Sequence, residues 1–145
     1  MFEIFLAFLG SLCPAILFNV ERKKFLWIGL SGSIGWLTFT GLNNTTGQLI
    51  FSTFLGAVAV GIYSEVMARI LKAPATVFSV SGIFPLVPGI GAYETVQLIV
   101  ENMLPQAASK AINTIASAGS IALGIMLVSA IFKASKRIRN SARFL

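Results

Sequence analysis

The sequence predicts an all-α membrane protein, a polytopic helical bundle of five spans in which the fourth span is broken. Its composition is the first observation, since 56% of the 145 residues are hydrophobic and 11% are charged, whereas about a quarter of the residues of a soluble domain are charged. The mean hydropathy is +0.86. The second observation is that five apolar segments follow one another with short connections, and the third is that basic residues recur after every second segment.

Each apolar segment is a candidate span, because a bilayer takes about 17 to 25 helical residues, although the first segment is marginal. The segments are 4–18, 25–42, 49–68, 75–104 and 111–132. A basic tail, 133–145, follows the fifth segment. We therefore assign residues 1–145 to a single transmembrane domain.

The basic residues are distributed unevenly along the chain. Ten of the eleven Lys and Arg residues follow the first, third or fifth segment, and the other, Lys110, is expected in a loop near the opposite membrane surface. The positive-inside rule then places the N-terminus outside the cell and the C-terminus in the cytoplasm. We expect the protein in the inner or plasma membrane. The basic tail is expected to contact anionic membrane lipid, not nucleic acid.

The sequence lacks the groups that most catalytic chemistry needs. It contains no histidine and no aspartate, which excludes a Ser-His relay, an aspartyl dyad and His-containing zinc sites. No P-loop pattern occurs either, so ATP hydrolysis on this chain is not expected. We expect no enzyme activity, no metal and no cofactor, and any energy input would come from an ion gradient or a partner subunit.

Rows of small residues predict where the helices pack, because membrane helices associate through close van der Waals contact. The rows are Ala116, Ser120 and Gly124 in the fifth segment, Ala57 and Gly61 in the third, and Ser31 and Gly35 in the second. Several such faces on so small a chain predict contacts with other subunits as well, and hence an oligomer.

The fourth segment is interrupted by Pro85, Pro88, Gly89 and Gly91. Each proline removes a backbone N–H, and the glycines are expected to supply permissive dihedral angles. The ten residues 75–84 would form about 15 Å of helix, which places the break near the midplane of a core about 30 Å thick. A second half-helix would begin near Gly91 and end near Leu104. Irregular backbone at this depth indicates a substrate pathway.

The residues around the break are the predicted binding site. The N-terminus of the second half-helix would attract a substrate carboxylate, and Glu94 in its first turn would contact a substrate ammonium or transfer a coupling proton. The predicted substrate-binding residues are Pro85, Pro88, Gly89, Gly91, Tyr93, Glu94, Ser79 and Ser81. The alternatives are a simple kink with an interfacial Glu94, or a re-entrant hairpin.

Three features of the sequence resemble those of a known family. They are the run Phe84-Pro85-Leu86-Val87-Pro88-Gly89, the following Tyr93 and the five-segment layout. In these features the sequence resembles the threonine/serine exporter family, specifically its short membrane subunit. That subunit corresponds to the C-terminal half of the full-length exporters. The resemblance implies export of threonine or serine, or of a dicarboxylate such as succinate, together with a larger membrane partner resembling the N-terminal half.

Two questions of function follow from this resemblance. A dicarboxylate substrate favours a fixed cation in the pathway, whereas the Glu94 carboxylate suits the ammonium group of an amino acid. We therefore expect an amino acid as the substrate. We also expect transport to be coupled to protons. The alternative from another class is a non-transporting structural or assembly subunit.

Overall fold

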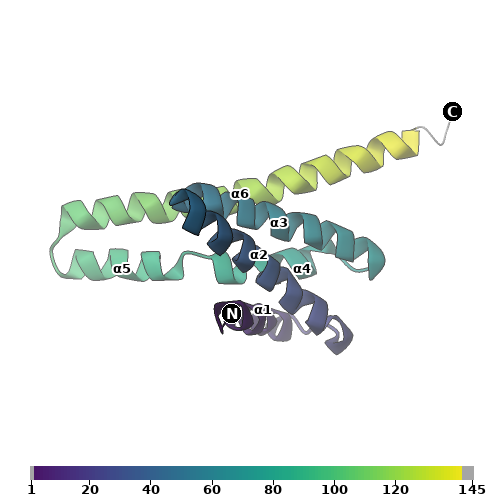
Figure 1. The fold of residues 1–145 in the computed structure, drawn as a ribbon, viewed down its shortest axis with the longest axis horizontal. Coiled ribbons are helices and arrows are strands. Elements are labelled where there is room, and N and C mark those ends of the chain that lie inside the picture. The colour runs from purple at the N-terminus through teal and green to yellow at the C-terminus, as the bar shows by residue number, and fades with distance from the viewer. Residues whose placement is uncertain (1, 142–145) are drawn as a thin grey trace.

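The computed structural model describes residues 2–141 as an elongated, all-helical protein (Figure 1). Over this range the chain forms six α-helices and two 3-10 turns and contains no strand. The elements are α1 (Phe2–Leu17), η1 (Arg22–Lys24), α2 (Phe25–Thr46), α3 (Leu49–Ile70), α4 (Ala75–Ile83), η2 (Phe84–Leu86), α5 (Gly89–Val100) and α6 (Leu104–Ser141). The predicted all-α fold is confirmed.

Three helices are long and apolar enough to cross a membrane, namely α2 with the preceding η1, α3 and α6. A fourth crossing arises if α4 with η2 and α5 form one span, since together they pass the same test with a bend of 47°. Helix α1 has 16 residues and is shorter than a full span. The fold therefore contains three or four candidate spans where the sequence predicts five.

The helices form a bundle with one extension. Helices α2, α3 and α4 pack on one another, α1 covers α2 and α4, and the later part of α6 lies along α3. Helix α5 packs against the first part of α6, and Figure 1 shows these two segments extending together beyond the rest of the bundle. The extension is thus an antiparallel helical hairpin.

Small residues bring α3 and α6 into close contact, as their spacing predicts. A Cβ atom added at Gly124 would lie 3.0 Å from the Cβ of Ala57, and one added at Gly61 would lie 3.1 Å from the Cβ of Val128. Around this contact the buried side chains of Ala57, Val60, Leu86 and Ile121 form one core cluster. The predicted rows in the third and fifth segments therefore mark a real helix–helix interface.

The other half of the bundle is fixed by α4. Phe78 is fully buried with Ala15 and Ile28 in a second core cluster. The Ser31 hydroxyl donates a hydrogen bond of 3.3 Å to the carbonyl oxygen of Phe78, which ties α2 to α4. The piece of chain that leads into the break is therefore held firmly against α1 and α2.

The break between α4 and α5 is built from two consecutive turns. Helix α4 gives way to η2, Val87 is extended with φ −61° and ψ 126°, and Pro88 follows with φ −76° and ψ 56°. The Gly89 N–H donates to the Val87 carbonyl at 2.7 Å, which makes Pro88 the centre of an inverse γ-turn. A residue before proline avoids helical angles, so Val87 adopts the conformation that its neighbour requires.

The predicted role of the two glycines in this break is wrong. The glycine with a positive φ is Gly47, in the turn between α2 and α3, whereas Gly89 and Gly91 belong to the first turn of α5. The break needs no left-handed residue because an extended Val87 and an inverse γ-turn at Pro88 already redirect the chain.

The break also lies further along the bundle than its predicted position at the midplane. The nine residues of α4, the three of η2 and the extended Val87 together cover about 23 Å of the roughly 33 Å that the 22 residues of α3 span. Leu86 accordingly packs near Gly56, and Pro88 and Gly89 share a small cavity with Leu49 and Thr53. The first turn of α5 is therefore level with the first turns of α3.

The end of α5 departs from the sequence prediction too. The helix stops at Val100 and not near Leu104, because Asn102 adopts a left-handed φ of 59°. The N–H of Asn102 donates to Ile99 and that of Met103 to Leu98, which is the Schellman arrangement that caps a helix C-terminus. Helix α6 begins directly afterwards, so Lys110 lies within a helix and not in a loop.

The α3–α6 interface gives a test of this packing. Gly124→Ala places a Cβ against the backbone of α3, whereas Gly119→Ala, in the same helix, meets nothing within 4 Å. Both substitutions gain the same helix propensity, so their difference isolates the contact. We expect Gly124→Ala to be less stable than Gly119→Ala by about 1–3 kcal/mol, measured by unfolding in detergent micelles. Equal stability of the two variants would contradict the interface.

Candidate functional site

A cavity of about 960 Å³ lies between the first turns of α3, the first turns of α5 and the first half of α6. Its volume falls within the range of small-molecule sites. The lining residues are Gln48, Leu49, Ile50, Phe51, Phe54, Pro88, Ile90, Gly91, Glu94, Lys110, Asn113, Thr114, Ser117, Ser120 and Leu123. The apolar part of this lining comes mainly from α3, and most of the polar part from α6.

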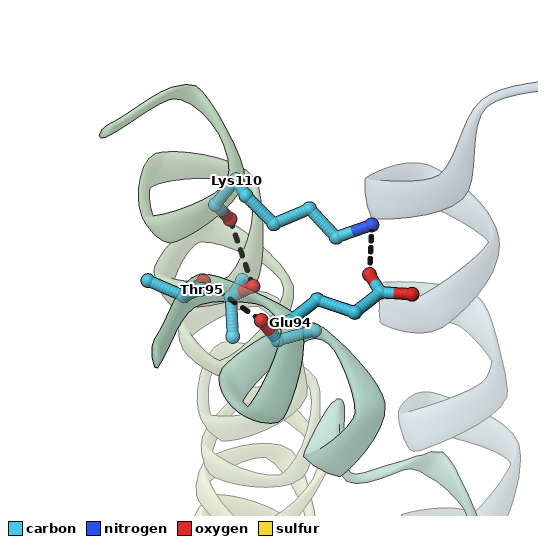
Figure 2. A network of polar contacts seen from close by, with 5 residues as sticks. Glu94, Thr95 and Lys110 are labelled. Carbon is cyan, nitrogen blue, oxygen red and sulfur yellow. Dashed lines mark hydrogen bonds and ion pairs between the residues drawn. The ribbon is translucent and has the colours of Figure 1, made fainter. Parts of the chain in front are cut away.

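A pair of opposite charges lies in this cavity. The Lys110 ammonium of α6 forms an ion pair with the Glu94 carboxylate of α5, as Figure 2 shows. The turn at Asn102 lies midway between the two residues in the chain, so the α5–α6 hairpin brings them side by side. The side chains are 41% and 42% exposed, and a ligand in the cavity could therefore reach both charges.

Close contact between α5 and α6 continues at Gly91, about one helical turn before Glu94 in α5. A Cβ atom added at Gly91 would lie 2.6 Å from the Thr114 hydroxyl oxygen. Glycine at this position lets the first turn of α5 approach α6 directly. Gly91 therefore serves the approach of two helices, which is a different role from the flexible turn that the sequence predicts.

Hydroxyl groups line the α6 side of the cavity, and each donates its proton to a backbone carbonyl of the same helix. The Thr114 hydroxyl donates to the Lys110 carbonyl at 2.8 Å, that of Ser117 to Asn113 at 2.9 Å, and that of Ser120 to Ser117 at 2.7 Å. Figure 2 shows the corresponding bond of Thr95, which donates to the Gly91 carbonyl at 2.7 Å. These protons are occupied by the helix backbone, so the hydroxyl oxygens are left to accept hydrogen bonds from a ligand.

The arrangement is chemically suited to a ligand that has both a carboxylate and an ammonium. Lys110 and the N-terminus of α5 favour negative charge, while Glu94 and the hydroxyl oxygens favour a donor with positive charge. Among residues 2–135, whose side chains the structure describes, no group of three His, Cys, Asp or Glu residues could hold a metal ion.

The predicted site residues separate into three groups. Pro88, Gly91 and Glu94 line the large cavity. Gly89 lines the small adjoining cavity of about 180 Å³, as Pro85 does.

The remaining predicted residues lie elsewhere. Tyr93 is 70% exposed on α5, and Ser79 and Ser81 belong to α4, before the break. The Ser81 hydroxyl is buried and has no hydrogen-bond partner among the described residues. None of these three lines the large cavity.

The sequence reasoning missed the contribution of α6. Its polar residues in the cavity are Lys110, Asn113, Thr114, Ser117 and Ser120. They recur at intervals of three or four within an otherwise apolar segment, which is the spacing of one helix face. Reading that spacing as a polar stripe would have found them.

Apolar helices around a cavity with paired charges define, as a class, a polytopic membrane protein with an internal polar site. Residues 3–131 match the family described as "Threonine/Serine exporter, ThrE". The chain therefore belongs to the threonine/serine exporter family, a family of transporters, and the resemblance noted in its sequence is confirmed.

A relative in Haemophilus influenzae is similar to almost the whole length of this chain. The two are 24% identical over 146 residues, which covers 95% of this chain and 49% of the relative, a protein described only as uncharacterized. The chain thus spans about half the length of this relative. No solved structure matches the chain.

The register of α5 on α6 can be tested by cross-linking. The added Cβ of Gly91 lies 3.6 Å from the Thr114 Cβ, within the range of a disulfide. In a Cys13→Ser background, which removes the single native cysteine, we expect Gly91→Cys with Thr114→Cys to lose both free thiols on mild oxidation. The readout is the gel shift produced by a thiol-reactive polyethylene glycol.

The control for this experiment is Gly89→Cys with Thr114→Cys, because Gly89 has open space around it. This pair should keep its thiols under the same oxidation. If both pairs stay reduced, the contact between α5 and α6 at the cavity is absent.

Proposed function

We propose that this chain is the membrane subunit of a secondary-active exporter of small carboxylate-bearing metabolites, with threonine or serine as the substrate. The observation on which the proposal depends is the Glu94–Lys110 ion pair at the wall of a hydroxyl-lined cavity. The cavity is the proposed substrate site, and Pro85, Pro88 and Gly89 shape its entrance.

A zwitterionic amino acid satisfies both members of the pair at once. Its carboxylate replaces Glu94 as the partner of Lys110, and its ammonium replaces Lys110 as the partner of Glu94. Neither protein charge is left unpaired in the loaded state, since each exchanges one charge-assisted hydrogen bond for another. The hydroxyl of threonine or serine finds acceptors along α6, where Thr114 and Ser117 direct their own protons to the backbone.

The position of Lys110 makes a dicarboxylate the second candidate. The sequence places this lysine near a membrane surface outside the pathway, whereas in the fold it lies at the cavity beside Glu94. Lys110 could bind one carboxylate of a succinate-like substrate, but Glu94 would repel the other unless it were protonated. The amino acid remains the better match because it needs no change of protonation.

Glu94 is the proposed site of proton coupling. Protonation of its carboxyl group removes the charge that holds the substrate ammonium, so proton binding and substrate binding would compete at the same oxygen atoms. Such competition exchanges one proton for one zwitterionic substrate molecule and links export to a proton gradient.

The proposed topology has five crossings, with α1 as a short first span and α4–α5 as a discontinuous fourth one. The basic residues Arg22, Lys72 and Lys133 lie at or beyond the ends of α1, α3 and the apolar part of α6, which supports a cytoplasmic C-terminus in the inner or plasma membrane. The cavity opens beside the other end of α3 and would face the external side.

A larger membrane partner is also part of the proposal. The uncharacterized relative is about twice as long as this chain, and the α5–α6 hairpin has apolar side chains that no other helix of the chain covers. Ile90 is 77% exposed, Val100 76% and Ile115 71%. A second membrane protein, resembling the N-terminal half of the full-length exporters, or membrane lipid around an oligomer would cover this surface.

Transport into inverted vesicles tests the proposed function. We expect accumulation of radiolabelled threonine or serine, more than of succinate, when the chain and its partner are both present and a proton gradient is applied. Glu94→Gln and Lys110→Gln should each reduce it roughly 10- to 100-fold, because a hydrogen bond to a charged group contributes about 1.5–3 kcal/mol.

The control is Glu101→Gln at the far end of α5, where the carboxylate only bonds the exposed Gln97 side chain. This variant should transport normally. Unchanged export by Glu94→Gln across a series of pH values would remove both the ammonium and the proton role. Absence of any transport by correctly inserted protein would favour a structural or assembly subunit.

The broken helix gives a separate prediction. Replacing Pro88 and Gly89 together by Ala restores a backbone N–H and raises helix propensity, so α4 and α5 should straighten and separate Glu94 from Lys110. We expect export to fall at least about tenfold with normal membrane insertion, by the same charged-contact estimate. Pro105→Ala is the control, since proline in the first turn of α6 is tolerated in place. Full activity of the straightened variant would refute the discontinuous span.

A further inference from the structure

A second cavity lies on the other side of the break, between α1, α2 and η2. Its volume is about 360 Å³, and its walls include Glu3, Trp36, Phe84 and Pro85 together with Leu6 and Gly10 of α1. Glu3 is the charged residue of this lining. The cavity is therefore an apolar and aromatic space with one carboxylate.

Glu3, an exposed residue of α1, contacts a distant part of the chain. The indole N–H of Trp36 donates to its Oε2 atom at 3.3 Å, across 33 residues of sequence. This bond engages one carboxylate oxygen, and within residues 2–135 Glu3 has no ion-pair partner. Among these described residues, the exposed Glu3 carboxylate thus has a neutral hydrogen-bond donor and no cation beside it.

We propose that this second cavity binds an organic ammonium group. The free oxygen of Glu3 accepts a charge-assisted hydrogen bond from the ammonium. Trp36 and Phe84 line the same space, and aromatic faces attract cations through their quadrupole. Leu6, Ala7 and Gly10 leave room for the alkyl part of the ligand. A carboxylate ligand finds no positive charge there. The cavity therefore selects the ammonium end of a zwitterion, whereas Lys110 attracts the carboxylate end.

The small third cavity adjoins both this site and the first one. It shares Trp36 and Pro85 with the second cavity and Pro88, Ile90 and Ser117 with the large one. The three spaces follow one another around the broken segment. The proposal of an ammonium site depends only on the residues of this cavity. Its role as a second binding site for the substrate rests on the proposed function.

Fluorescence of Trp36 provides the test. The chain has two tryptophans, so Trp27→Phe leaves Trp36 as the reporter in the full chain. Titration with propylammonium chloride should give a saturable change in emission, whereas sodium propionate and sodium chloride at equal ionic strength should not. Glu3→Gln should weaken the response at least tenfold, and Glu21→Gln should leave it unchanged, because Glu21 is an exposed carboxylate beyond α1, immediately before η1.

A variant in the large cavity separates this proposal from the proposed function. Glu94→Gln should reduce export roughly 10- to 100-fold and leave the Trp36 response to propylammonium intact. A saturable response that survives Glu3→Gln, or an equal response to propionate, overturns the ammonium site. A folded protein, judged by its helical circular dichroism, that shows no saturable response overturns it as well.

Discussion

Two prolines three positions apart impose the constraint on which the rest of this structure depends. Neither Pro85 nor Pro88 has a backbone N–H, so the hydrogen-bond ladder of α4 cannot continue through them. The chain answers with η2, an extended Val87 and an inverse γ-turn. All three cavities adjoin the interruption.

The charged site depends on a second turn, at Asn102, as much as on the break. A left-handed asparagine in a Schellman motif ends α5 early and starts α6 at once, and the two helices then run back along each other. Glu94 and Lys110 meet because they are equally far from that turn. The two charges neutralise each other at the wall of the cavity and stay partly exposed there. In the proposed function, the charges of a small zwitterion take their places.

The sequence predicts the helices better than it predicts their relative placement. The segments 25–42, 49–68 and 75–84 nearly coincide with helices, because apolar length and proline position decide them locally. The sequence predicts a last segment that begins at residue 111, seven residues after the actual start of α6, since Pro105 and the polar residues after it resemble a loop. Proline is nevertheless well tolerated in a first helical turn. The meeting of Glu94 with Lys110 is a tertiary contact, and no local pattern encodes the length of the hairpin that produces it.

The continuity of α6 has a mechanical consequence. Its 38 residues form one uninterrupted helix of about 57 Å, with Lys110 near one end and the basic residues that follow Phe132 near the other. A continuous helix transmits rotation and tilt along its length, whereas α4 and α5 can hinge at their interruption. Tilting of α6 at its basic end about Gly124, which lies against α3, would therefore move Lys110 and the cavity wall at the opposite end.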